Sequence, residues 1–247
     1  MSVSVKPETS CLALACLHVT ADASHELRTP IALMRTRTEV ALRKQRSEAD
    51  YRETLLRIHQ ELERTSALIE NLMTLARADS GSEALQVAPT SLNELLLEIS
   101  ETARLLAEGK SIQYDQRLPE TSLCVSGNAP SLRRLFLILI DNAVKYTSRE
   151  GHVSVELDTD NSAAVIEIRD TGVGISPSDL PHIFERFYRA DESRSRESGG
   201  TGLGLSIAKW IAEAHQGKIS VASKVGEGSV FRVQIPLSEE RGPSRSV

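Results

Sequence analysis

A short segment near the N-terminus, Ser24 to Pro30, combines a nucleophile with a base. The imidazole of His25 can attack an electrophile, and the carboxylate of Glu26 beside it can orient the ring and accept its proton. Thr29 is four residues from His25 and therefore lies on the same helix face. Pro30 removes a helical hydrogen bond and should bend the helix beside the nucleophile. A solvated histidine at an ordinary kink is the alternative explanation.

A second group of residues is suited to bind a metal, an anion or a ring. Asn142 carries an amide oxygen of the kind that Mg²⁺ accepts, and Lys145, on the same helix face, can contact phosphate oxygens. Asp170, at the end of an expected strand, can accept a hydrogen bond from an exocyclic amine, and Gly172 and Gly174 let the backbone approach a ring closely. An amphipathic helix and a tight turn explain these two segments when each is taken singly.

Glycines recur in the segment 200–206, directly before the last expected helix. Such glycines expose backbone amides to an anion at a helix N-terminus. The segment is neither a P-loop, since no Gly-Lys-Ser/Thr follows, nor a Rossmann fingerprint, since its spacing is Gly-x-Gly-x-Gly. Phe184 to Arg189 precedes it, with aromatic residues to anchor a loop and arginines to neutralise phosphate. A turn at Gly226 to Ser229 leads into the last expected strand.

In their order and spacing, these segments resemble the motifs of the sensor histidine kinases of two-component systems. Ser24 to Pro30 is similar to their H-box, and residues 131–237 are similar to the ATP-binding domain that they share with DNA gyrase, Hsp90 and MutL. The resemblance implies an all-α helical hairpin, which forms a dimeric four-helix bundle. An α/β sandwich of the α+β class, with the Bergerat-type ATP-binding fold, should follow it.

The resemblance also implies a role for each motif residue. His25 is expected to be phosphorylated from ATP with help from Glu26, Thr29 to position water when the partner is dephosphorylated, and Asn142 to bind Mg²⁺. The residues expected to bind ATP are Asn142, Lys145, Tyr146, Asp170, Gly172, Gly174, Arg189, Gly200, Thr201, Gly202, Leu203 and Gly204. The expected activity is that of a protein-histidine kinase, which passes the phosphoryl group to an aspartate in the receiver domain of a response regulator.

One position departs from the pattern of that family. Ile138, four residues before Asn142, stands where many members have a second Asn and where the gyrase and chaperone branch has a water-activating Glu. Isoleucine cannot activate water, so the pocket is expected to hold ATP for transfer to His25. Two alternatives stay open, namely a nucleotide-binding scaffold that acts through protein contacts alone, and an ATPase of the gyrase or chaperone type.

Two long helices are expected to position His25, because apolar or small residues recur at steps of three and four. The first seam is Ser24, Leu27, Ile31, Met34, Thr38 and Ala41, and the second, after a polar break at 45–49, is Tyr51, Leu55, Ile58, Leu62, Thr65, Ile69, Leu72 and Ala76. His25 lies one step off its seam and should face solvent. Because one hairpin cannot bury both seams, it should pair with a second copy as a homodimer.

The rest of the chain predicts a mixed domain after a linker at 79–90. Helices are expected at 91–108, with Ser91 as N-cap, at 130–146 and through Ala208 and Ile211, and strands at 111–116, 122–126, 153–157, 164–169, 218–221 and 230–235. They should form a mostly antiparallel sheet with helices on one face, and the polar segment 189–202 is typical of a mobile lid. The predicted boundaries are 1–18 leader, 19–79 dimerisation and phosphotransfer, 80–90 linker, 91–238 ATP binding and 239–247 tail.

Composition excludes several classes of protein. The 247 residues are 40% hydrophobic and 26% charged, as in globular proteins, and a net charge of −5 with dispersed cations argues against nucleic-acid binding. Cys11, Cys16 and Cys124 lack paired spacing and are interpreted as reduced thiols. The apolar run at 11–17 falls well short of the roughly 20 residues that cross a bilayer. We therefore expect no membrane segment, a short or truncated leader and a cytoplasmic location.

Overall fold

The computed structural model describes the backbone of residues 7–80, 86–190 and 201–238, and the side chains of these residues except 7–22, His25 and Ser80. The chain divides into two compact units, Met1–Ala76 and Arg77–Val247, each of which is described by itself. Across the described ranges, no helix combines the length and the apolar character that a membrane span requires.

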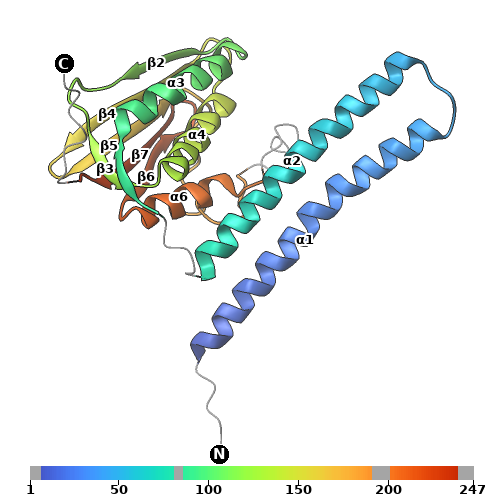
Figure 1. Ribbon diagram of the computed structural model, residues 1–247, viewed down its shortest axis with the longest axis horizontal. Coiled ribbons are helices and arrows are strands. Elements are labelled where there is room, and N and C mark those ends of the chain that lie inside the picture. The colour runs from blue at the N-terminus through green and yellow to red at the C-terminus, as the bar shows by residue number, and fades with distance from the viewer. Residues whose placement is uncertain (1–6, 81–85, 191–200, 239–247) are drawn as a thin grey trace, which may run out of the picture. The chain divides into compact units, whose positions relative to one another are not determined.

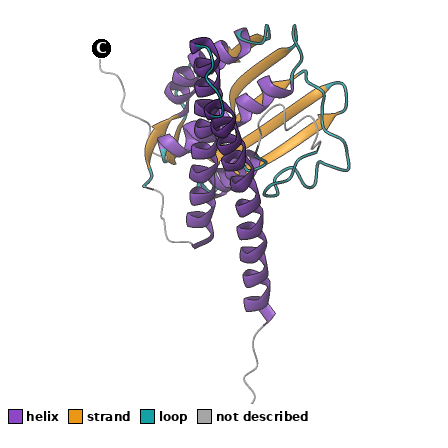
Figure 2. Cartoon of the chain, turned by 90° about the vertical axis from the view of Figure 1, so that its right-hand side faces the viewer, coloured by secondary structure: helices purple, strands orange, loops and turns teal. Residues whose placement is uncertain are grey.

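The first unit is a hairpin of two long helices, α1 (Pro7–Leu42) and α2 (Glu48–Ser80), which run side by side in both views (Figures 1 and 2). Helix α1 begins at Pro7, so the expected leader is helical from that residue on. Ser47 starts α2 as a reciprocal cap, because its Oγ accepts from the Asp50 amide at 3.2 Å while the Asp50 carboxylate accepts from the Ser47 amide at 3.3 Å.

The hairpin buries only part of its apolar surface. Leu68 and Leu75 are 3% and 2% exposed and make up most of the buried core of α2, whereas Leu55, a member of the predicted seam, is 66% exposed. The predicted second seam therefore includes residues that this hairpin alone leaves exposed. Leu62 and Ile69 of this seam belong to an exposed apolar stripe, and another surface is required to bury that stripe.

In its described residues, the second unit is an α/β sandwich of three helices and two sheets. Its helices are α3 (Leu92–Glu108), α4 (Ala129–Tyr146) and α6 (Gly204–Ala214), and its strands are β1 (Ala88–Ser91), β2 (Gln113–Arg117), β3 (Cys124–Gly127), β4 (His152–Asp160), β5 (Ala163–Asp170), β6 (Lys218–Lys224) and β7 (Gly228–Pro236). The main sheet has the order β2-β4-β5-β7-β6, and all its pairs except β2–β4 are antiparallel. Strand β1, which occupies part of the predicted linker, pairs with β3 in a small second sheet.

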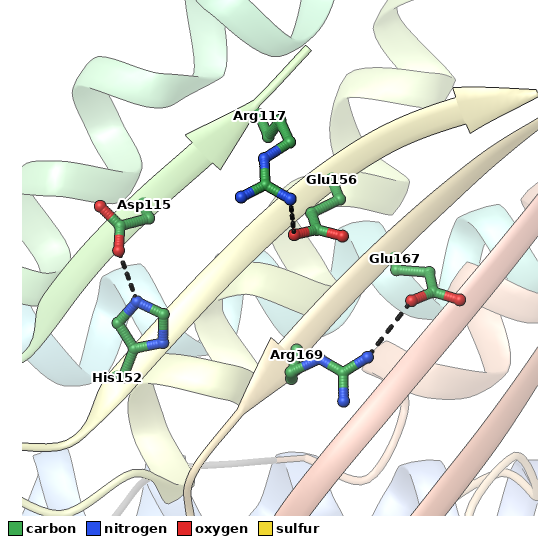
Figure 3. A network of polar contacts seen from close by, with 6 residues as sticks. All are labelled: Asp115, Arg117, His152, Glu156, Glu167 and Arg169. Carbon is green, nitrogen blue, oxygen red and sulfur yellow. Dashed lines mark hydrogen bonds and ion pairs between the residues drawn. The ribbon is translucent and has the colours of Figure 1, made fainter. Parts of the chain in front are cut away.

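Helices cover one face of the main sheet, and the other face is charged. On β4, Val153, Val155 and Leu157 are buried while the residues between them are not, so burial alternates as the pleat requires. Figure 3 shows pairs on the open face: Asp115–His152 at 2.6 Å, Arg117–Glu156 at 3.3 Å and Glu167–Arg169 at 3.5 Å. This two-layer arrangement confirms the fold predicted for the domain, with helices on one face (Figure 1).

Candidate functional site

Helix α4 carries Asn142, Lys145 and Tyr146 in its last two turns. Asn128 is the N-cap of this helix, and its side chain accepts a hydrogen bond of 3.0 Å from the Ser131 amide. Its apolar face, made of residues such as Phe136 and Leu139, is fully buried and fixes the rotation of the helix about its axis. Asn142 and Lys145 are consequently held at the half-buried edge of that face.

Two cations, Lys145 and Arg189, act on each other near this end of α4. Burial lowers the pKa of the Lys145 amine, Asp141 partly offsets this effect, and Arg189 adds positive charge that lowers the pKa further. Arg189 itself has its Nε and Nη2 buried without a hydrogen-bond partner among the described residues. Buried guanidinium nitrogens are normally paired, so this arrangement favours a ligand that brings negative charge.

Asp170 lies at the end of β5 and is only 6% exposed. Its Oδ1 accepts hydrogen bonds from the amides of Gly172 at 2.8 Å and Ser229 at 3.2 Å. Burial raises the pKa of Asp170, while these donors lower it. Because both backbone donors contact Oδ1, Oδ2 is the atom that can accept a hydrogen bond from an amine.

Two glycines of the predicted motifs occupy positions that a side chain would not tolerate. Gly174 has a φ of +70°, and a Cβ at this position would clash with the carbonyl of Lys224. Gly202 has a φ of +71°, and its Cβ would lie 2.7 Å from the carbonyl carbon of Phe187. Both glycines therefore allow backbone segments to approach each other in the left-handed conformation.

The N-terminus of α6 has no side-chain cap. Leu203, which is fully buried, occupies the cap position without a capping hydrogen bond from its side chain. Amides at such a helix N-terminus can bind an anion. Gly204 faces α4, since a Cβ there would lie 3.3 Å from Ile138 Cγ2, and Thr201 is half-buried. Gly200 and most of the expected lid lie outside the described residues.

The three predicted residues of the first unit all lie on α1. Glu26 is half-buried and Thr29 is exposed, while the side chain of His25 lies outside the described residues. The structure therefore brings the residues of the second unit together and leaves the geometry at His25 a prediction. In the described part of the chain, no group of three or more His, Cys, Asp or Glu residues could hold a metal ion.

Sequence reasoning missed two residues around this site, Ser223 and Lys110. Ser223 Oγ accepts from the Ile175 amide at 2.8 Å and lies 3.0 Å from Ser229 Oγ, so it joins the turn after β5 to the β6–β7 hairpin. Lys110 donates to the end of α4. A serine in a strand and a lysine in a turn are common, and the partners of Lys110 are 34 to 37 residues away, so no local signal could have found them.

Two family models match the chain. Residues 17–81 match the His Kinase A (phospho-acceptor) domain, and residues 127–239 match the histidine kinase-, DNA gyrase B- and HSP90-like ATPase. The sensor histidine kinase RppB of Synechocystis sp. is 38% identical over 219 residues, which are 88% of this chain and 48% of RppB. The chain thus spans about half the length of the curated relatives that it matches.

Solved structures with the same architecture include two histidine kinases. Full-length ShkA in complex with AMPPNP is 25% identical with a TM-score of 0.66, and the match covers 98% of this chain and 48% of ShkA. ThkA in complex with the response regulator protein TrrA is 21% identical with a TM-score of 0.73, and the match covers 92% of this chain and 63% of the other. The second likeness is one of fold alone.

Proposed function

The chain belongs to the sensor histidine kinases of two-component systems, and we therefore propose that it transfers the γ-phosphoryl group of ATP to His25. The two units divide the work. The proposed boundaries are those predicted from the sequence, with residues 19–79 for dimerisation and phosphotransfer and residues 91–238 for ATP binding. The reaction needs a site for a polyanion, a site for adenine and a nucleophile.

The unpaired nitrogens of Arg189 beside Lys145 are the single observation that best supports a triphosphate site. Phosphoryl transfer depends on positioning the phosphates and stabilising their charge, and two partly buried cations supply both. The uncapped N-terminus of α6 adds backbone amides from Gly204 onward. An ATP molecule would neutralise Lys145 and Arg189 and bind the Arg189 nitrogens that have no partner among the described residues.

Asn142 fits a Mg²⁺ ion that is held mostly by the nucleotide. Magnesium takes six oxygen ligands and usually keeps one or two protein ligands together with substrate phosphates and water. The absence of an acidic metal cluster among the described residues is consistent with such a site, since an amide oxygen and phosphate oxygens suffice. When bound, the ion would neutralise charge on the phosphates, while Asn142 would orient it.

Asp170 is proposed to recognise adenine. Its Oδ2 can accept a hydrogen bond from the exocyclic amine, because Oδ1 already holds the amides of Gly172 and Ser229. Tyr146 and Val173, two partly exposed apolar residues joined by a backbone hydrogen bond of 3.2 Å, can pack against the ring. This combination of an acceptor and an apolar rim favours adenine over a base that lacks an amine.

In the proposed step a ring nitrogen of His25 forms a bond to the γ-phosphorus while the bond to the bridging oxygen breaks and ADP leaves. Glu26, the adjacent residue, would take the ring proton, and Thr29 would later position water for dephosphorylation of the partner. The ThkA–TrrA complex supports a response-regulator receiver domain as the partner whose aspartate takes the phosphoryl group. The exposed seam that contains Leu55 and Ile69 supports a homodimer.

A titration with ATP and Mg²⁺ tests the triphosphate site. Arg189→Met should weaken ATP binding about tenfold or more, because a charge-assisted contact is lost. Arg169→Met is the matched control, since Arg169 lies on the open face of the sheet and should leave binding unchanged. Equal affinity for ATP in the wild type and Arg189→Met would contradict the proposal.

Phosphate release without labelled protein would favour a gyrase-type ATPase, and binding without either reaction would favour a scaffold.

A further inference from the structure

The last four carbonyl groups of a helix ordinarily have no hydrogen-bond partner within that helix. In α4 all four of them accept a hydrogen bond. The carbonyl of Ala143 accepts from Thr147, through the amide at 3.1 Å and the hydroxyl at 2.7 Å. The carbonyl of Tyr146 accepts from the Val173 amide at 3.2 Å. The remaining two, those of Val144 and Lys145, accept from a single side chain that comes from another part of the chain.

That side chain is Lys110. Its Nζ donates to the carbonyl oxygens of Val144 at 3.0 Å, Lys145 at 2.5 Å and Thr147 at 2.8 Å. An ammonium group has three N–H donors, and all three are used here. The positive charge also lies at the negative end of the helix dipole.

A side chain is needed because the backbone does not cap this helix. Thr147, the residue at the C-cap, has φ −87° and ψ 135°, which is extended. Helices that cap themselves usually continue into a left-handed residue, which turns following amides back onto the last carbonyls. The chain then turns at residues 148–151 before β4, and the amides of Glu150 and Gly151 donate to Ser111 and Ser148, so the donors for these carbonyls come from elsewhere.

The fold holds Lys110 firmly at this point. The residue follows α3, and its amide donates to the carbonyl of Ala107 at 3.0 Å. The next residue, Ser111, turns the chain with a φ of 57°, and its carbonyl accepts from the Glu150 amide at 2.8 Å. Lys110 is thus fixed on both sides, by α3 and by the loop that follows α4.

We propose that Lys110 is a positioning residue for phosphate binding, which holds the last turn of α4 so that Lys145 and Asn142 face the triphosphate. This inference rests on the proposed function, because it assumes that these two residues bind the phosphates and the ion. Lys110 itself would contact neither the nucleotide nor the metal. It bonds to the backbone carbonyl of Lys145, the residue that is proposed to contact the phosphates.

Three variants test this role: Lys110→Met, Lys110→Arg and the control Lys218→Met, at an exposed position of the edge strand β6. In nucleotide-free protein, Lys110→Met should speed amide hydrogen exchange at 144–147 while leaving the other helices protected. Its affinity for ATP should fall about tenfold, in line with the loss of charged hydrogen bonds, while its affinity for adenosine changes little. Lys110→Arg should recover part of this loss, because a planar guanidinium keeps the charge but cannot reach all three carbonyls from one point.

The comparison of ATP with adenosine separates positioning from general destabilisation. All measurements are made well below the thermal midpoint of each variant, where the protein is folded. Unchanged exchange at 144–147, or an equal loss of affinity for ATP and adenosine, would overturn the role of Lys110. A wild-type protein that does not bind ATP would overturn the proposed function instead, while the exchange data would still test the contact.

Discussion

The backbone amide of Val173 donates a hydrogen bond of 3.2 Å to the carbonyl oxygen of Tyr146. This bond joins the turn after β5, where Asp170 lies, to the end of α4. The carbonyl of Val173 in turn accepts from the Gly226 amide at 2.8 Å, which adds the β6–β7 turn. The adenine end and the phosphate end of the proposed site therefore share one backbone network, and changes at either end can be tested separately.

Asp170→Asn should abolish most ATP binding without unfolding the protein. The Asn side chain can keep an oxygen toward the amides of Gly172 and Ser229, but its NH₂ group would then face the exocyclic amine of adenine. We expect a loss of about a hundredfold in ATP affinity, measured by titration calorimetry. Unchanged affinity would show that Asp170 does not recognise the base.

The same variant should become more stable relative to wild type as pH rises. Burial raises the pKa of Asp170 above its ordinary value of 3.8, so the folded state favours the protonated carboxyl. The contribution of the Asp170 carboxyl to folding stability is fully present below pH 3.8, and it is lost as pH rises through the raised pKa. Because Asn does not titrate, thermal unfolding across this range should show a midpoint difference that grows in favour of Asp170→Asn toward neutral pH. A difference that is constant with pH would contradict the role of burial.

Gly202→Ala and Gly226→Ala form a matched pair that separates backbone strain from a steric clash. Both glycines have a positive φ, of +71° and +81°, but a Cβ on Gly226 would meet nothing within 4 Å. Gly226→Ala should cost about 1 to 2 kcal/mol of unfolding free energy from backbone strain alone. Gly202→Ala should cost about 1 to 3 kcal/mol more, because its Cβ would meet the backbone of Phe187. Equal losses in urea denaturation would exclude the clash.

Leu68 and Ile69 are adjacent on α2 but should have different roles. Leu68 is 3% exposed within the hairpin, so Leu68→Ala should destabilise the fold by about 2 to 5 kcal/mol. Ile69 is 45% exposed, so Ile69→Glu should keep the helical circular dichroism of the hairpin while weakening the proposed homodimer. Sedimentation measurements should then show more monomer for Ile69→Glu. A dimer that resists this change would place the interface elsewhere.

Much of the second unit could be predicted from local pattern. The N-cap at Ser91 is confirmed by a hydrogen bond of 3.3 Å from the Glu94 amide, and α4 begins within one residue of its predicted start. Strand β1 was missed because its four residues include Pro89, and it exists through its pairing with β3, whose partner residues lie 33 to 39 positions away (Ser91 with Cys124, Ala88 with Gly127). Such pairing is set by tertiary contacts and leaves no periodic signal.

The first unit and the support of the site were harder to predict. A heptad pattern identifies apolar stripes but does not say which stripe packs within the hairpin, so it could not single out Leu68 and Leu75 as the residues buried there. Lys110 could not be found because its role depends on two segments that meet only in the folded domain. The motif residues could be proposed from the sequence because their chemistry is local, whereas the residues that hold them could not.

The most direct test of transfer to His25 is an autophosphorylation assay. The purified wild type and His25→Gln are each incubated with γ-labelled ATP and Mg²⁺, and the chemical stability of any label on the protein is then measured. The proposed function predicts an acid-labile, alkali-stable label on the wild type and none on His25→Gln, with ATP affinity equal in the two proteins. A label that persists on His25→Gln, or a wild type that binds ATP and remains unlabelled, would contradict transfer to His25.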